Sequence, residues 1–144
     1  MKGNIADVGC GSKPYVSFFT AVDNYTGYDM VNEGHSHANE TIDILFDGRT
    51  IPAASESYDS AISSEVLEHV FWPGGWLAEI NRILKPGGVF LLTCPFMFHE
   101  HEIPNDYARY SSYGLKFLLL QNGFEIMKQK KQPQVCNVYC CNGI

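Results

Sequence analysis

Short apolar runs separated by polar turns recur along the chain and predict the strands of a sheet. The predicted strands are Ile5–Val8, Tyr25–Asp29, Ile42–Phe46, Tyr58–Ser63, Val89–Cys94, Phe124–Met127 and Val135–Cys140. An almost wholly apolar run such as Val89–Cys94 is typical of a central parallel strand that is covered on both faces. The strand pattern therefore favours a buried, mostly parallel sheet.

Apolar residues at helical spacing predict two helices between these strands. The first covers Trp76–Leu84 and is expected to end at Lys85, because a proline follows and disfavours a helical residue before it. The second covers Leu115–Leu119, with a serine cap at position 111 or 112 and a stop at Asn122-Gly123. Both helices alternate with predicted strands, as crossover connections in a parallel sheet do.

A short helix over Tyr15–Thr20 and a polar loop over residues 31–41 complete the pattern. The alternation predicts one α/β domain over residues 1–144, with a Rossmann-like, doubly wound sheet and helices on both faces. Ligands of such sheets bind outside the carboxyl ends of the strands, where the strand order reverses. The residues that follow each strand are therefore the candidates for function.

Charge and cysteine usage exclude several classes of function. Ten basic residues against sixteen acidic ones give a net charge of -6, which disfavours a nucleic-acid partner. No signal segment or apolar run long enough to span a bilayer is present, and the five cysteines fit a reducing, cytoplasmic setting. The cluster Cys136, Cys140 and Cys141 lacks a second ligand pair, and His35 and His37 lack a third ligand, so no metal site is predicted.

Acidic residues and a glycine turn follow the first three predicted strands. Gly9-Cys10-Gly11 comes directly after Asp7 and Val8, and glycines at such a turn let a ligand approach the backbone. Asp29 ends the second strand and is placed to accept hydrogen bonds from ribose hydroxyls. Asp47 ends the third strand, before Gly48, and is placed to accept one from an adenine amino group. For each feature alone, a plain solvated turn is an equal alternative.

A dinucleotide would use a similar turn, but its fingerprint requires a third glycine or alanine three residues after Gly11. Pro14 occupies that position and interrupts the backbone donors that a pyrophosphate needs. An adenosyl cofactor without phosphates does not need them. A nicotinamide-dependent dehydrogenase is therefore the weaker alternative.

Three segments together resemble class I S-adenosylmethionine (SAM)-dependent methyltransferases. Asp7–Gly11 resembles motif I of that family, Tyr58–Val70 its fourth-strand segment, and Leu84–Leu92 the segment before and along its fifth strand. The resemblance implies SAM as cofactor. It also implies that the cofactor is bound by Asp7, Gly9, Cys10, Gly11, Asp29, Asp47, Gly48, Ser64 and Glu65.

The segment after the fifth strand, residues 95–110, is rich in polar and aromatic residues and is the candidate acceptor-binding loop. It resembles a bacterial subgroup of type 11-like methyltransferases, often encoded near genes for surface glycan assembly, which implies a small-molecule or glycan acceptor. His99 and His101 are candidate bases oriented by Asp106. The candidate substrate-binding residues are Glu102, Tyr107, Arg109 and Tyr110. A structural network of His101, Asp106 and Arg109 that only anchors the loop is an equal alternative.

The chain departs from the family pattern at both ends. The first strand begins almost at Met1, whereas the family usually has a helix before it that covers the cofactor. The C-terminal end also looks short for the usual antiparallel hairpin. We therefore expect an abbreviated fold: either the sequence is a fragment, or another chain, such as a second copy, supplies the missing cofactor cover. A non-catalytic SAM-binding or degenerate interaction module is the competing hypothesis.

Overall fold

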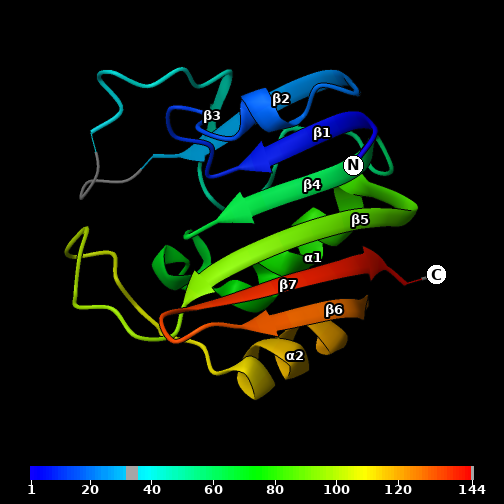
Figure 1. The fold of residues 1–144 in the computed structure, drawn as a ribbon. Helices are drawn as coiled ribbons and strands as arrows, with labels where there is room; N and C mark the ends of the chain where they lie inside the picture. The colour runs from blue at the N-terminus through cyan, green and yellow to red at the C-terminus, as the bar shows by residue number, and fades with distance from the viewer. Residues whose placement is uncertain (32–35, 144) are drawn as a thin grey trace.

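A computed structural model of the chain describes residues 1–31 and 36–143; residues 32–35, including His35, and residue 144 lie outside the described residues. Its strands form one seven-stranded sheet of order β3-β2-β1-β4-β5-β7-β6 (Figure 1). The strands are β1 (Gly3–Val8), β2 (Val22–Met30), β3 (Ile44–Phe46), β4 (Tyr58–Ser64), β5 (Leu84–Pro95), β6 (Phe124–Lys131) and β7 (Val135–Asn142).

The sheet is parallel except at its C-terminal edge. β1 pairs in parallel with both β2 and β4, β2 with β3, and β4 with β5. The strand order therefore reverses between β1 and β4, and the carboxyl ends of both strands open on the same edge. This is the position at which doubly wound sheets bind ligands, so the prediction of a Rossmann-like, mostly parallel sheet is confirmed.

The C-terminal hairpin is present in full, which corrects the expectation of a shortened C-terminal end. β7 pairs antiparallel with β5 from Val135 opposite Pro95 to Cys141 opposite Val89. β6 pairs antiparallel with β7 along the outer edge. The sequence predicted a shorter strand at Phe124–Met127, because only that part is apolar. The observed β6 continues to Lys131 through polar, mostly exposed residues.

The two α-helices follow the predictions closely. α1 (Pro73–Ile83) begins with proline at its first turn, and α2 (Ser112–Gln121) is capped by Ser111, whose side chain accepts a hydrogen bond from the Gly114 N–H. The first helix ends before Lys85, because β5 begins at Leu84 and includes the proline and glycines expected in a loop. The sheet register shifts opposite this segment, which lets a strand contain a proline.

The short helix predicted for Tyr15–Thr20 is only a 3-10 turn, η1 (Val16–Phe18). It lies over one face of β1 and β4, where the Tyr15 hydroxyl lies 3.1 Å from Ser64 Oγ. The other face is covered by α1, which lies behind β4, β5 and β7 in Figure 1 and contacts α2. Helices were predicted on both faces. Among the described residues, one face has the two α-helices, and the other has only the 3-10 turn η1.

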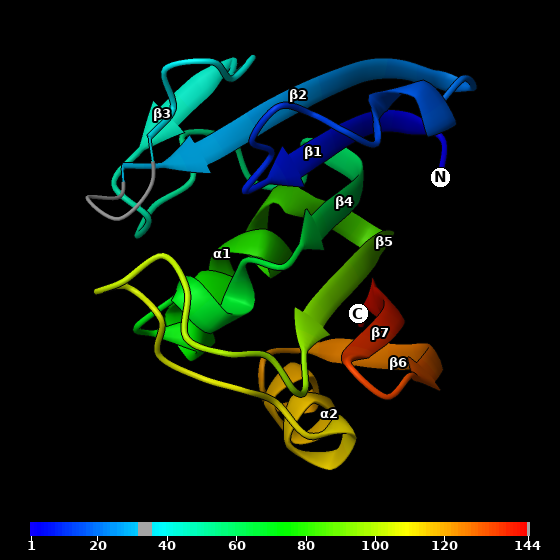
Figure 2. The same cartoon turned by 60° about the vertical axis from the view of Figure 1, so that its left-hand side comes forward.

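The hydrophobic core lies between the sheet and the two α-helices. Trp76, Leu77 and Ile80 of α1 and Phe90 and Leu92 of β5 are buried there. Among the described residues, no helix combines the length and apolarity needed to cross a bilayer. Figure 2 shows the loop between β5 and α2: residues 96–111 leave the end of β5, extend beyond the sheet and return to α2.

Candidate cofactor and acceptor site

Two adjoining hollows lie at the carboxyl edge of the sheet, and Met30 and His69 line both. The larger has a volume of about 470 Å³, which falls within the range of small-molecule sites. It extends from the end of β3 to the first turn of α1. The smaller, about 110 Å³, lies against the β1 turn.

The glycine turn after β1 forms one wall of the smaller hollow. Gly9 and Gly11 have φ angles of +82° and +46°, a region that glycine adopts without strain. A Cβ added at Gly9 would lie 2.2 Å from Val66 Cγ2, so only glycine fits there. The sequence prediction of a tight turn that a ligand can approach is met at both positions.

The acids that end β2 and β3 are held by backbone N–H groups. Asp29 accepts hydrogen bonds from the Gly11 N–H at 2.8 Å and from the Met30 N–H at 2.7 Å, and it lines the smaller hollow. Asp47 accepts from the two N–H groups that follow Gly48, which hold the pKa of its carboxyl below the usual value. Asp47 and Gly48 line the larger hollow.

Asp7 and Cys10 lie behind the turn and do not line either hollow. The Asp7 carboxyl is 2% exposed, and the Tyr25 hydroxyl donates a hydrogen bond to it. Burial raises the pKa of Asp7 to about 6, against the opposing effect of that hydrogen bond. Burial also raises the pKa of the Cys10 thiol to about 12. Their contribution to a ligand site is therefore support of the turn.

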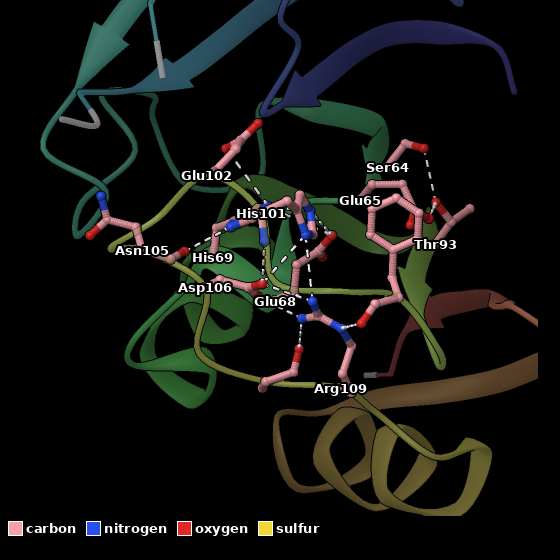
Figure 3. A network of polar contacts seen from close by, with 12 residues as sticks. Ser64, Glu65, Glu68, His69, Thr93, His101, Glu102, Asn105, Asp106 and Arg109 are labelled. Atoms are coloured by element: carbon pink, nitrogen blue, oxygen red, sulfur yellow. Dashed lines mark hydrogen bonds and ion pairs between the residues drawn. The ribbon is translucent and has the colours of Figure 1, made fainter. Parts of the chain in front are cut away.

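Ser64 and Glu65 at the end of β4 line the smaller hollow opposite the glycine turn. Ser64 Oγ lies 2.9 Å from Thr93 Oγ1, and the Thr93 hydroxyl donates to Glu65 Oε1 at 2.7 Å. These contacts tie the β4 end to β5 (Figure 3). Both residues therefore lie opposite the turn, and their binding of the cofactor, which the resemblance implies, stays a prediction.

A cluster of two histidines and a buried glutamate lies between the smaller hollow and the loop after β5 (Figure 3). His69 Nε2 is 3.1 Å from His101 Nε2, and Glu68 Oε1 lies 3.7 Å and 3.8 Å from these two nitrogens. The Glu68 side chain is fully buried, which raises its pKa to about 8. The donor atoms of these residues are close enough to hold one metal ion.

Asp106 and Arg109 anchor the loop beside this cluster. Arg109 binds both carboxylate oxygens of Asp106, at 2.5 Å and 2.8 Å, and this ion pair holds the Asp106 pKa well below its usual range. Asp106 Oδ2 also accepts from the His101 N–H at 2.9 Å. The anchoring network proposed as an alternative to catalysis is therefore present, while the His101 ring itself faces His69.

The other predicted residues of this loop are spread around the site. Glu102 lines the smaller hollow, with Oε2 3.7 Å from His69 Nε2, and Tyr107 lines the larger. The exposed His99 ring lies outside the histidine cluster and stacks on Phe98. Tyr110 packs against the hydrophobic core, and burial raises its pKa to about 12.

Sequence reasoning did not single out Glu68 or His69 as site residues. The available signal was a single glutamate among apolar residues in Val66–Val70, because a buried acid at such a position needs a reason. His37, for which the sequence offered no metal site, has both ring nitrogens engaged: they contact Glu40 at 2.6 Å and the Met30 carbonyl at 2.9 Å. Burial opposes a charge on His37, but these contacts prevail and raise its pKa.

Comparison with known proteins agrees with this architecture. Residues 6–92 match the family described as methyltransferase domain. An uncharacterized methyltransferase of Mycolicibacterium vanbaalenii is 34% identical over an alignment that covers 67% of this chain and 42% of that protein. An O-methyltransferase of Pyrenophora dematioidea is 29% identical, with 87% of this chain and 55% of that protein covered.

Solved structures share the fold at low sequence identity. A SAM-dependent methyltransferase of Mesorhizobium loti superposes with a TM-score of 0.75 at 14% identity, covering 96% of this chain and 90% of that one. One from Aquifex aeolicus gives 0.71 at 15% identity, covering 96% and 81%. The chain thus spans 42% and 55% of the length of the two curated relatives described above. The family match extends over more than half of the residues, and the chain belongs to the methyltransferase domain family.

Proposed function

We propose that this chain binds SAM along the carboxyl edge of the sheet and transfers its methyl group to an oxygen of a small-molecule or glycan acceptor. One observation carries the proposal. The glycine turn, Asp29, Asp47 and His69 of the histidine cluster all line the same pair of adjoining hollows. A cofactor and an acceptor bound there would be in contact.

The residues present fit SAM in chemistry and in space. The open turn at Gly9 and Gly11 suits the methionine portion, since added Cβ atoms would crowd it. Asp29 suits the ribose, because a carboxylate accepts from two neighbouring hydroxyls. Asp47 and Gly48 suit the adenine, with Ser64 and Glu65 beside the sulfonium; Asp7 and Cys10 support the turn from behind.

Methyl transfer from a sulfonium is an in-line displacement. The acceptor oxygen forms a bond to the methyl carbon while the carbon–sulfur bond breaks, and its electron pair stays on sulfur. SAM carries the driving force, so the protein mainly aligns the partners and excludes water. We propose that His101 contacts the acceptor oxygen and that Asp106 orients it through the His101 N–H. His99 on the same loop is a further candidate base.

The larger hollow, whose end at Asp47 is assigned to the adenine, has beside α1 an aromatic rim that suits a ring-shaped acceptor. Phe71 and Trp72 are 75% and 80% exposed, and the Phe71 ring packs edge-on against Tyr107. Aromatic faces stack on the apolar face of a sugar or an aromatic ring. Tyr107 and Glu102 would contact the acceptor there, with Arg109 and Tyr110 holding the loop. A sugar or glycolipid acceptor in the cytoplasm fits this rim and the unpaired state of the cysteines.

Calorimetry with SAM and with its demethylated product tests the cofactor assignment. Asp29→Asn is expected to weaken binding about tenfold or more, because it loses one charged acceptor for the ribose. Asp23→Asn is the matched control, since Asp23 is exposed at the other end of the same strand. Equal affinities in both variants would contradict the assignment.

Transfer of a labelled methyl group to a panel of sugars, glycolipids and phenols tests the reaction. We expect transfer to a hydroxyl compound and its loss in His101→Ala. SAM binding without transfer to any member of the panel would instead favour a non-catalytic binding module. Sedimentation at increasing protein concentration tests whether a second copy completes the cofactor cover.

A further inference from the structure

The Glu68 carboxylate is the least satisfied polar group of the site. It is 0% exposed, and neither of its oxygens has a hydrogen-bond partner among the residues that the structure describes. The residue lies in η2 (Leu67–His69), whose backbone is fixed by the loop above it: the Tyr107 N–H donates to the Glu68 carbonyl at 2.8 Å. A buried carboxyl without a partner is costly, so this one requires a ligand of its own.

The hydrogen bonds of the neighbouring histidines define where their lone pairs point. His69 Nδ1 lies 2.7 Å from the Asn105 carbonyl oxygen. Because a carbonyl only accepts, Nδ1 carries the hydrogen, and the neutral ring has its lone pair on Nε2. His101 Nδ1 likewise lies near two acceptors, the His99 carbonyl at 3.2 Å and Asp106 Oδ2 at 3.4 Å.

Arg109 Nη2 is also 3.4 Å from His101 Nδ1, but it makes shorter bonds to the His99 carbonyl at 2.9 Å and to Asp106 at 2.8 Å. The His101 lone pair is therefore also on Nε2. Two lone pairs face each other across 3.1 Å, with the carboxylate of Glu68 on one side. That arrangement is repulsive unless a positive centre lies among the three groups.

A metal ion satisfies all three groups at once. Zinc–nitrogen and zinc–oxygen bonds of about 2.0–2.2 Å place two ligand atoms about 3 to 4 Å apart for angles between 90° and 130°. The observed separations of 3.1, 3.7 and 3.8 Å fall within that range. The outer nitrogens donate to the backbone carbonyls of Asn105 and His99, and metal-binding histidines almost always have such an outer acceptor.

We propose that His69 Nε2, His101 Nε2 and Glu68 Oε1 bind one divalent transition-metal ion such as Zn²⁺ or Mn²⁺. Two imidazoles and a carboxylate suit these ions better than Mg²⁺ or Ca²⁺, which prefer oxygen ligands alone. Three protein ligands leave coordination positions open, as in catalytic sites. His69 lines both hollows, so the open positions face bound ligands.

A second group of potential ligands, Asp29, His37 and Glu40, does not have the same character. Both ring nitrogens of His37 are already engaged, one by Glu40 and the other by the Met30 carbonyl. Asp29 accepts two backbone hydrogen bonds. The ligand atoms of this group lie close together, but His37 pairs with Glu40 and Asp29 with backbone N–H groups, so the group does not require an ion.

The role of the ion, unlike its binding, rests on the proposed methyl transfer. A divalent ion lowers the pKa of a bound hydroxyl and fixes its oxygen. An acceptor oxygen held there would be placed to attack the methyl carbon of SAM, with the displaced electron pair left on sulfur. The Glu102 carboxylate, which lines the same hollow, would take the hydroxyl proton. His101 thus contacts the acceptor through the ion.

Metal titration of the chelator-treated chain tests the site without any cofactor. We expect one Zn²⁺ bound per chain by calorimetry, and one Co²⁺ with the visible absorption of nitrogen-ligated cobalt. His101→Gln and Glu68→Gln are expected to weaken binding more than about 100-fold, since loss of an outer partner alone costs 10- to 100-fold. Glu100→Gln is the matched control, because Glu100 is exposed on the same loop. Circular dichroism confirms that each variant folds.

Two results would overturn the site. One is the absence of stoichiometric binding to the folded wild-type chain. The other is binding that His37→Gln abolishes and His101→Gln leaves intact, which would move the ion to the other group. Full methyl transfer by the chelated chain would overturn the role of the ion. Failure of the proposed function is distinct from all three, because it appears with the metal-loaded wild-type chain, as absence of SAM binding or as absence of methyl transfer.

Discussion

The two halves of the carboxyl edge hold their charges in different ways. At the cofactor edge, after β1 to β3, Asp29 and Asp47 are fixed by backbone N–H groups within a few residues or on the adjacent strand. At the acceptor edge, after β4 and β5, the loop charge of Asp106 is held mainly by a side chain of the same loop rather than by the sheet. Asp106 pairs with Arg109, and Glu68 has no hydrogen-bond partner among the described residues.

The difference separates a half that the sheet holds rigidly from a half whose geometry depends on the position of a loop. Backbone donors at strand ends are placed by the sheet itself and cost little to keep in position. The acceptor edge instead depends on the loop after β5 folding back over η2, which the Tyr107 and Ala108 N–H groups do by donating to the Glu68 carbonyl. Perturbing the cofactor edge should therefore damage the whole domain, and perturbing the acceptor edge should damage the loop first.

The largest effect is expected for Gly9→Ala at the cofactor edge. The φ of +82° costs a non-glycine residue about 1–3 kcal/mol, and the clash with Val66 adds a similar amount. We expect the free energy of unfolding to fall by about 4 kcal/mol and SAM binding to be lost. Chemical denaturation and calorimetry measure both.

Gly74→Ala in α1 is the control for that variant. A Cβ there has Asn122 Oδ1 at 3.9 Å as its nearest neighbour, an ordinary contact. Alanine in a helix is up to about 1 kcal/mol better than glycine, so this variant should be neutral or stabilised. A similar loss in both variants would mean that the β1 turn is no more constrained than a helix.

Asp7 should give the cofactor edge a pH dependence of its own. Burial raises its folded pKa to about 6, against an unfolded value near 4. The Tyr25 hydroxyl and Lys13 act against this shift, and Asp29 adds to it. Because the folded pKa is the higher one, the contribution of Asp7 to the free energy of unfolding is greatest below pH 4. That contribution is lost as the pH rises through about 6.

The Asp7 shift corresponds to about 3 kcal/mol, at roughly 1.4 kcal/mol for each pKa unit. Denaturation midpoints of wild type and Asp7→Asn at pH 4, 5, 6 and 7 isolate this contribution, since other carboxyls titrate in both. The difference between the two proteins should change over this interval. A constant difference would show that Asp7 has the same pKa in the folded and unfolded chain.

The contrast between the two edges also explains what the sequence revealed. The succession of strands along the chain, both α-helices and the positions of Asp29 and Asp47 followed from local patterns, because strand ends and caps are set within a few residues. The position of Ser64 followed from the family resemblance. The contact between His69 and His101 did not follow from such patterns. The two residues are 32 positions apart in the sequence, and the loop after β5 brings them together. A burial pattern placed Glu68 among apolar neighbours, but only the folded chain shows that its carboxylate lacks a partner.

Arg109→Ala should affect the acceptor edge by a smaller amount. It leaves the Asp106 carboxylate, 4% exposed, without its cation, and it removes donors to the Phe98 and His99 carbonyls. Loss of one partner from a fully buried pair costs about 3–5 kcal/mol; with Arg109 itself 23% exposed, we expect about 2 kcal/mol. Hydrogen exchange should accelerate in residues 96–110 before it does in β1 or β4.

Lys85→Ala provides the matched comparison, because Lys85 and Asp59 form an ion pair of 2.6 Å whose side chains are 44% and 37% exposed. Exposed pairs contribute about 0–1 kcal/mol, so this variant should change little. If the two variants lose equal stability, the Asp106–Arg109 pair is an ordinary surface contact, and the acceptor loop must be held by something else.

The smallest effect concerns the point where the acceptor loop ends. Ser111 Oγ accepts a hydrogen bond from the Gly114 N–H at 3.1 Å and caps α2. Ser111→Ala should cost about 1 kcal/mol and Ser111→Gly only a few tenths, because glycine leaves the first turn open to water. Ser112→Ala, one residue inside the helix, should cost nothing. Equal losses at both serines would mean that the Ser111 cap does not hold the end of the loop. The acceptor edge would then depend on the Asp106–Arg109 ion pair even more than we infer.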